Sequence, residues 1–183
     1  MPAFVSRALA LAAVLAATAT AAEAQVGLTS NSATVALTAT KAATLTLSAV
    51  TPTASLASIT DNSTANNFTP VSVTTDWNLT AGSTVNLVGW FAVPAQALAN
   101  GTSFIPSSRV QGRVGAAEFA AFNAGPLGSA GVAGGSLTLF SQSVVGDLLN
   151  TRTDQLDLRL DLTGTTTVAG DYTGTLNLQA IVQ

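Results

Sequence analysis

The last thirty residues of the chain, 154–183, carry the pattern that most constrains its fold. Their first half alternates apolar with polar or charged residues, the apolar positions being Leu156, Leu158, Leu160 and Leu162. After a turn-rich segment, 163–171, a second run repeats the alternation from Tyr172 to Val182. A period of two residues is typical of a strand with one buried face. Two such runs joined by glycine-containing turns predict an antiparallel pair in an all-β domain.

The same period recurs upstream and predicts further strands. The expected ranges are 33–39, 43–49, 71–79, 85–93 and 137–141. Lys41 falls on the apolar parity between the first two ranges, which favours a break or a corner there. Residues 94–135 are irregular, with a helical turn expected over 94–101 and a short helix over 115–124. We therefore expect an immunoglobulin-like Greek-key β-sandwich of about seven to nine antiparallel strands, with a short helix in a long loop.

Residues 1–24 have the organisation of a secretory signal peptide. Arg7 supplies a positive charge, residues 8–21 form a short apolar run, and residues 22–24 (AEA) fit a small-x-small cleavage site. The apolar run is shorter than the roughly 20 residues that a membrane-spanning helix needs. The sequence therefore predicts export by way of the periplasm to the cell surface or the medium, with residues 25–183 as one mature domain.

Composition matters here mainly for the functions that it excludes. The chain has no cysteine and no histidine, which removes disulfides, thiol nucleophiles and the commonest general base and metal ligand. Charged residues make up 8% of the chain and the net charge is −3, so a nucleic-acid partner is not expected. With so little charge, the polar surface has to come from Thr, Ser, Asn and Gln, and β-branched Thr favours strands.

Carboxylates are too few and too scattered to predict an enzyme. Asp157 and Asp161 share the polar face of one expected strand with Arg159 between them, which is typical of a solvated face rather than of a catalytic pair. Glu118 is the only glutamate after residue 24. The aspartates match no calcium-loop spacing, and no serine or threonine has a recognisable activating base. We expect no catalytic residue, no metal and no cofactor.

The segment Ala-Gly-Asp-Tyr-Thr-Gly-Thr-Leu-Asn-Leu at 169–178 resembles the last strand of bacterial secreted pilin-like proteins of the fimbrial and spore-coat-U kind. A signal peptide and a threonine-rich first strand add to the resemblance. It implies a β-sandwich with an extracellular structural or assembly role. The absence of cysteine is a departure, because such subunits usually carry a disulfide.

The N-terminal alternation suggests how such a protein could assemble. Val35, Leu37 and Ala39 form an uncharged row, which could be the first strand of its own domain or could complete the sheet of a neighbouring copy. We therefore expect a structural or adhesive surface subunit, whose partners are further copies or other surface subunits. The alternative is a secreted carbohydrate-binding module.

That alternative depends on aromatic residues. Trp77, Trp90 and Tyr172 are the candidates for stacking on sugar rings. The tryptophans can equally lie in or near the core, since tryptophan is highly buried on average. A tryptophan exposed beside polar hydrogen-bonding groups would favour carbohydrate binding, whereas two buried tryptophans would exclude it.

Overall fold

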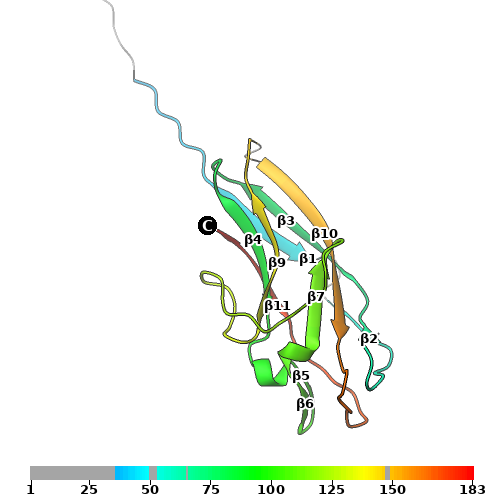
Figure 1. Cartoon of the computed structure of the whole chain (residues 1–183). Helices are drawn as coiled ribbons and strands as arrows, with labels where there is room; N and C mark the ends of the chain where they lie inside the picture. The colour runs from blue at the N-terminus through cyan, green and yellow to red at the C-terminus, as the bar shows by residue number, and fades with distance from the viewer. Residues whose placement is uncertain (1–35, 50–52, 65, 147–148) are drawn as a thin grey trace, which may run out of the picture. The chain divides into compact units, whose positions relative to one another are not determined.

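The alternating segments form two antiparallel sheets that lie face to face (Figure 1). This computed structural model describes residues 36–49, 53–64, 66–146 and 149–183, and its strands lie in the compact unit 41–183. The first sheet has the strand order β1-β3-β10-β7-β8, with β2 also paired to β10. The second sheet has the order β11-β4-β9. The prediction of an all-β sandwich is confirmed.

The strands follow the predicted alternation closely in most places. The first sheet contains β1 (Thr44–Ala49), β2 (Asn66–Asn67), β3 (Val71–Asn78), β7 (Val110–Val114), β8 (Ala120–Ala121) and β10 (Leu149–Leu160). The second contains β4 (Thr84–Trp90), β9 (Ser136–Ser143) and β11 (Asn177–Val182). The buried row of β10 consists of Leu156, Leu158 and Leu160, so the leucine alternation does form a strand with one buried face. The expected antiparallel pairing of this run with the run that ends at Val182 is wrong, because β10 and β11 belong to different sheets.

Between β4 and β7 the chain forms a small hairpin and two single turns. The hairpin consists of β5 (Leu98–Asn100) and β6 (Ser103–Ile105), and the turns are the 3-10 helices η1 (Pro94–Gln96) and η2 (Ser107–Arg109). The helical turn expected over 94–101 is thus limited to η1, because the chain enters β5 directly afterwards.

Two glycines shape the middle of the core. Phe122 is fully buried between the sheets, where its ring contacts Gly89 of β4 and Gly112 of β7. A Cβ on either glycine would lie 3.0 Å from this ring, which is closer than ordinary packing allows. The ring also meets Phe91 edge to face, with the two ring centroids 5.3 Å apart. Phe122 therefore fills the space that two absent side chains leave.

The expectation of a short helix over 115–124 is wrong. In a helix Phe119 and Phe122 would lie on the same face, but the structure directs them to different places. Phe122 enters the core, whereas the Phe119 ring packs against the guanidinium groups of Arg113 and Arg159, which lie 4.3 and 4.1 Å from its centroid. The segment pairs with β7 as the short strand β8 instead.

The glycine-rich segment 123–135 packs against one face of the second sheet, away from the main core. Leu127 and Ala130 of this segment contact Val88 of β4 and Ile181 of β11. They form a second, smaller apolar cluster. Only this part of the expected excursion 94–135 lies outside the main core, because β7 is a paired strand of the first sheet and Phe122 is buried between the sheets.

The N-terminal part departs from the predicted strands. Strand β1 begins at Thr44, close to the expected range 43–49. Residues 36–40 are exposed and form no strand, so the prediction of a strand over 33–39 is wrong for that part. A single strand is not stable in water without a neighbour to pair with and to pack on. Positions 33–35, like the expected signal peptide, lie outside the described residues.

Candidate functional site

A sandwich of two sheets has two long sides, and in this protein they differ. On one side β9 of the second sheet faces β7 and the first half of β10 in the first sheet. Arg152 of β10 crosses that gap, because its guanidinium lies 4.1 Å from the ring centroid of Phe140 and donates a hydrogen bond of 2.9 Å to Gln142. Asp154 holds the same arginine in an ion pair. Side chains of the protein itself therefore close this side.

On the opposite side β1 and β11 approach each other but do not pair. Strand β1 pairs with β3 and β11 pairs with β4, and within the described parts of the chain neither has a partner on its other edge. We call this side the open seam; β1 bounds it on one sheet and residues 172–182 bound it on the other. An unpaired strand edge presents backbone N–H and C=O groups that can pair with another strand. The open seam is thus a place where a sheet can be extended.

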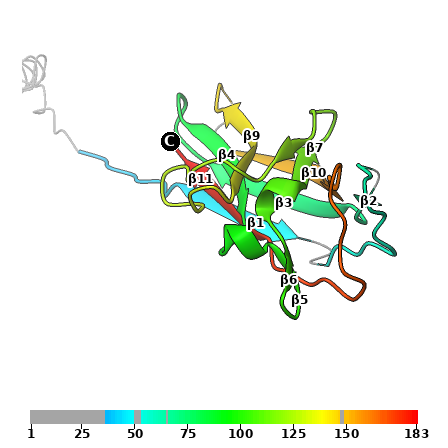
Figure 2. The same ribbon diagram turned by 60° about the horizontal axis from the view of Figure 1, so that its bottom comes forward.

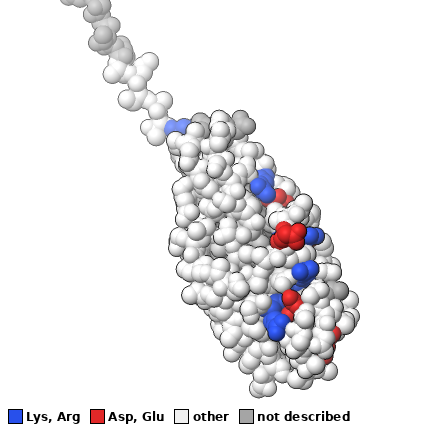
Figure 3. Space-filling model, in the orientation of Figure 1, with Lys and Arg blue, Asp and Glu red and all other residues white. Residues whose placement is uncertain are grey.

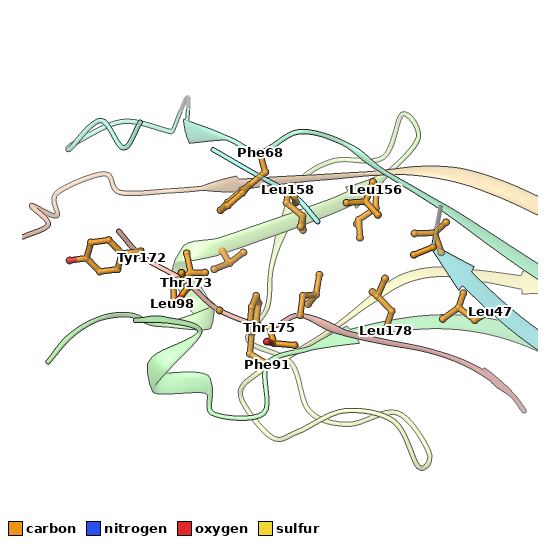
Figure 4. Close-up of a pocket in the computed structure, with 17 residues that line it drawn as sticks. Leu47, Phe68, Phe91, Leu98, Leu156, Leu158, Tyr172, Thr173, Thr175 and Leu178 are labelled. Carbon is orange, nitrogen blue, oxygen red and sulfur yellow. The ribbon is translucent and has the colours of Figure 1, made fainter. Parts of the chain in front are cut away.

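A cavity of about 550 Å³ opens along the open seam into the core. Figure 4 shows it between two walls, with Phe68, Leu156 and Leu158 on one wall, Phe91, Thr175 and Leu178 on the other, and Leu47 and Tyr172 towards opposite ends. Most of the remaining lining is apolar as well, including Val71, Val73, Leu98, Val110 and Leu176. Protein cores are normally packed without voids of this size. The cavity is suited to a row of small and medium apolar side chains.

The segment 172–176 forms one lip of the open seam, and its position follows from close packing on β5. Thr173 exchanges two backbone hydrogen bonds with β5, with N–O distances of 2.8 and 3.0 Å. Next to it, Gly174 lies so close to the carbonyl oxygen of Ala97 that a Cβ would overlap it. Packing therefore requires this glycine. Pairing with β4 begins only at Asn177, later than the alternation from Tyr172 predicts.

The three residues of the predicted assembly strand lie outside the strands of the sandwich or outside the described residues. Leu37 is 90% exposed, Ala39 is also exposed, and neither belongs to a strand. Val35 lies outside the described residues. The described part of this row therefore presents its apolar side chains to solvent.

The three predicted sugar-stacking residues form no common platform. Trp77 lies in the core and is 2% exposed, so its prediction as a stacking platform is wrong; its Nε1 has no hydrogen-bond partner among the described residues. Trp90 is half-buried in the small cluster against the segment 123–135. Tyr172 is half-buried at one end of the cavity, and Figure 4 shows its hydroxyl group directed away from the other lining residues.

The charged residues lie mostly away from the open seam, and Figure 3 shows many of them in a band along one side of the molecule. Asp157 forms an ion pair with Arg113 at 3.0 Å. Hydrogen bonds from Thr163 hold the pKa of Asp161 below its ordinary value, and nearby arginines lower the pKa further. Both aspartates therefore make structural contacts. No group of three acidic side chains able to hold a metal ion occurs among the described residues.

Comparisons of the chain with protein-family models, with curated proteins and with solved structures found no match. Within the described residues, no helix is both long and apolar enough to cross a membrane. The open seam is the structural feature that points most directly to a function. Sequence reasoning identified both of its strands, but it missed their free edges, because pairing depends on contacts between distant segments.

Proposed function

We propose that the protein is an exported structural subunit of the cell surface that assembles by strand donation. The row Val35, Leu37 and Ala39 of one copy enters the open seam of the next. Its apolar side chains fill the cavity, and its backbone pairs with the free edge of β11. The observation that carries the proposal is an apolar cavity of about 550 Å³ beside two strand edges that have no partner within the described residues.

The order of the strands supports an added strand at this position. In an immunoglobulin-like Greek-key sandwich one sheet has the order A-B-E-D, and in the other sheet strand F lies between C and G. The order β1-β3-β10-β7 is compatible with the first of these, and β11 beside β4 is compatible with F beside C. Strand β9, which lies on the other edge of β4 and falls between β7 and β10 along the chain, has no counterpart in that order. Within the described residues no strand takes the place of G beside β11. A donated strand would complete the sandwich.

The exposed N-terminal row supplies the complementary half of the contact. Leu37 is 90% exposed in the chain, and full burial of a leucine side chain stabilises by about 1.5–3 kcal/mol. Each new backbone hydrogen bond to β11 contributes about 0.5–1.5 kcal/mol net. Ordering a backbone residue costs about 1–2 kcal/mol. Since the hydrogen bonds alone roughly offset that cost, the apolar row has to provide the surplus that makes assembly favourable.

Light scattering and negative-stain electron microscopy on residues 25–183, beside a variant lacking residues 25–40, test the proposal. We expect oligomers or fibres from the longer protein and none from the shorter one. A synthetic peptide of residues 25–40 should bind the shorter protein and raise its melting temperature, because it fills the seam. Near-UV circular dichroism of the buried Trp77 shows whether the shorter protein is folded. A monomeric longer protein, or fibres that survive truncation, would contradict strand donation.

The carbohydrate-binding alternative has weaker support. Trp77 is buried and Trp90 is half-buried in an apolar cluster, so Tyr172 is the candidate that remains beside the cavity. A single aromatic side chain whose neighbours are mainly apolar does not make a sugar site, because sugar hydroxyls need polar partners. We therefore favour assembly.

A further inference from the structure

The open seam has a direction. At one of its ends Gln183, which follows β11, exchanges backbone hydrogen bonds with Thr84, the first residue of β4. At the same end Asn78, the last residue of β3, donates a hydrogen bond to the carbonyl oxygen of Ala42, just before β1. Thus β1 starts where β11 finishes, and the two strands run in opposite directions along the seam (Figures 1 and 2). We call the two ends the Gln183 end and the Tyr172 end.

This direction fixes where a donated strand leaves the seam. The strand pairs of both sheets are antiparallel throughout, and antiparallel pairing is slightly the more stable kind. A donor that pairs in this way with β11 enters at the Gln183 end and leaves at the Tyr172 end. Lys41 follows Ala39 by two residues, or about 6.6 Å along a strand. Antiparallel pairing that places Val35 opposite Leu178, at the start of β11, places Ala39 opposite Gly174 in the segment that lines the cavity. In this register the residues before Val35 continue along β11, and Lys41 emerges beside Tyr172.

Lys41 and Asp171 are the charges that this arrangement brings together. Lys41 is the chain's only lysine, and it is exposed and forms no ion pair or hydrogen bond among the described residues. Asp171 directly precedes Tyr172, is exposed, and likewise has no side-chain partner among the described residues. It lines a second hollow of about 480 Å³ that shares Tyr172 with the cavity of the open seam.

Other charges are less suited to meet a donor at this place. The described aspartates that have a partner are Asp61, which Thr167 contacts, and Asp154, Asp157 and Asp161. Asp76 and Glu118 form no side-chain hydrogen bond or ion pair among the described residues, but they lie elsewhere. Asp76 is on β3 near the Gln183 end, and Glu118 precedes β8 at the far edge of the first sheet. Charge and position together single out Asp171.

We propose that Lys41 of the donating copy forms an ion pair with Asp171 of the receiving copy, and that this pair sets the register of the donated strand. This second proposal rests on strand donation and adds the direction in which the donated strand runs along the open seam. An apolar row with a period of two can slip by two residues without changing which side chains face inward. A charge pair at the end of the row makes one of these registers more favourable than its neighbours.

The same geometry makes the contact head-to-tail. The Gln183 end of one copy, which carries its Lys41, faces the Tyr172 end of the next copy. Such a contact uses two different surfaces of the same chain, so it leaves one of each unused and can repeat without limit. The expected product is an open filament rather than a closed dimer.

Cross-linking tests the position of the pair directly. The natural chain has no cysteine, so Lys41→Cys and Asp171→Cys variants can be mixed, and a disulfide between them must join two chains. A disulfide requires Cα atoms about 4.4–6.8 Å apart. We expect a mixed disulfide between these two variants under mild oxidation. Lys41→Cys mixed with Asp76→Cys is the matched control and should give none.

Charge reversal tests whether the pair matters energetically. We expect Lys41→Glu and Asp171→Lys each to raise the critical concentration for assembly roughly fivefold at low salt, as the loss of an exposed ion pair implies. The double variant Lys41→Glu/Asp171→Lys should restore the value, whereas Lys41→Glu/Asp76→Lys should not. High salt should shrink all of these differences.

The outcomes separate the two proposals. Filaments that form normally but cross-link through Asp76→Cys, or through neither partner, overturn the Lys41–Asp171 pair and its polarity while leaving strand donation in place. Filaments whose critical concentration is the same in all charge variants overturn the role of the pair in setting the register. If the natural protein, residues 25–183, forms no filament at any concentration, strand donation is wrong. The proposed ion pair between Lys41 and Asp171 is then wrong as well.

Discussion

Leu37 offers the sharpest test of strand donation, because its environment should differ between the free and the assembled chain. The side chain is 90% exposed in the chain itself. Replacing it with alanine should therefore leave the melting temperature of the monomer unchanged within about 1 °C, as is usual for exposed positions. Thr38 is its neighbour on the opposite parity and provides a matched control.

The magnitude follows from the burial that donation would bring. Leu37→Ala removes three side-chain carbons, and truncation of a buried leucine costs about 2–5 kcal/mol. We take about 2 kcal/mol, the lower end, because the cavity lies at an open side of the sandwich. Since 1.4 kcal/mol corresponds to a factor of ten, the critical concentration should rise about thirtyfold. Thr38→Ala faces solvent in the same register, so it should change the critical concentration less than threefold.

Analytical sedimentation of residues 25–183 over a concentration series measures these values. The reasoning is refuted if Leu37→Ala and Thr38→Ala assemble alike. It is also refuted if Leu37→Ala lowers the melting temperature of the monomer by several degrees, since that would place Leu37 in the core of its own chain. Buried Trp77 gives a fluorescence signal for the monomer measurement.

Three further predictions concern the sandwich itself. Gly89→Ala places a Cβ 3.0 Å from the Phe122 ring and should destabilise the protein by about 1–3 kcal/mol, measured as a shift in the urea midpoint; an unchanged midpoint would mean that the ring can move aside. Gly174→Ala places a Cβ on the Ala97 carbonyl oxygen. It should both lower the melting temperature and weaken binding of a peptide of residues 25–40. A lower melting temperature with unchanged peptide binding would mean that Gly174 does not shape the open seam. Hydrogen bonding by Thr163 is the main cause of the lowered pKa of the Asp161 carboxyl group. The free energy of unfolding of the natural protein should therefore exceed that of Asp161→Asn above about pH 4. This difference in stability should vanish as the pH falls through the folded-state pKa of Asp161. A difference that stays constant from pH 7 to pH 2 would contradict it.

The alternation in the sequence predicted those parts of the fold in which local pattern and tertiary packing agree. Leu156, Leu158 and Leu160 form the buried row of β10, and the leucines of the expected range 43–49 lie on β1. The strand after Tyr172 begins five residues late because Gly174 has to approach β5 closely, and nothing in the spacing of apolar residues reveals that contact.

The helix expected over 115–124 fails for a similar reason. Its two phenylalanines have separate partners, with Phe122 between the two sheets and Phe119 between two arginines of neighbouring strands. Gly89 is far from Phe122 in the sequence, and Arg159 is far from Phe119. A local pattern of residues therefore does not reveal these contacts. The open seam is a stronger case, because whether β1 and β11 have free edges depends on the pairing of the entire sandwich.

The opposite directions of β1 and β11 have a mechanical consequence for a filament built by strand donation. A pull along the filament axis acts parallel to the donated strand, because that strand enters a subunit at one end and leaves it at the other. Its backbone hydrogen bonds to β11 run perpendicular to the strands. The pull therefore loads these bonds together in shear, instead of opening them one after another as in a zipper. The force needed to draw one subunit from the next should rise with the number of paired residues. Each removal of two residues from the N-terminal segment 25–40 should therefore lower that force by one step.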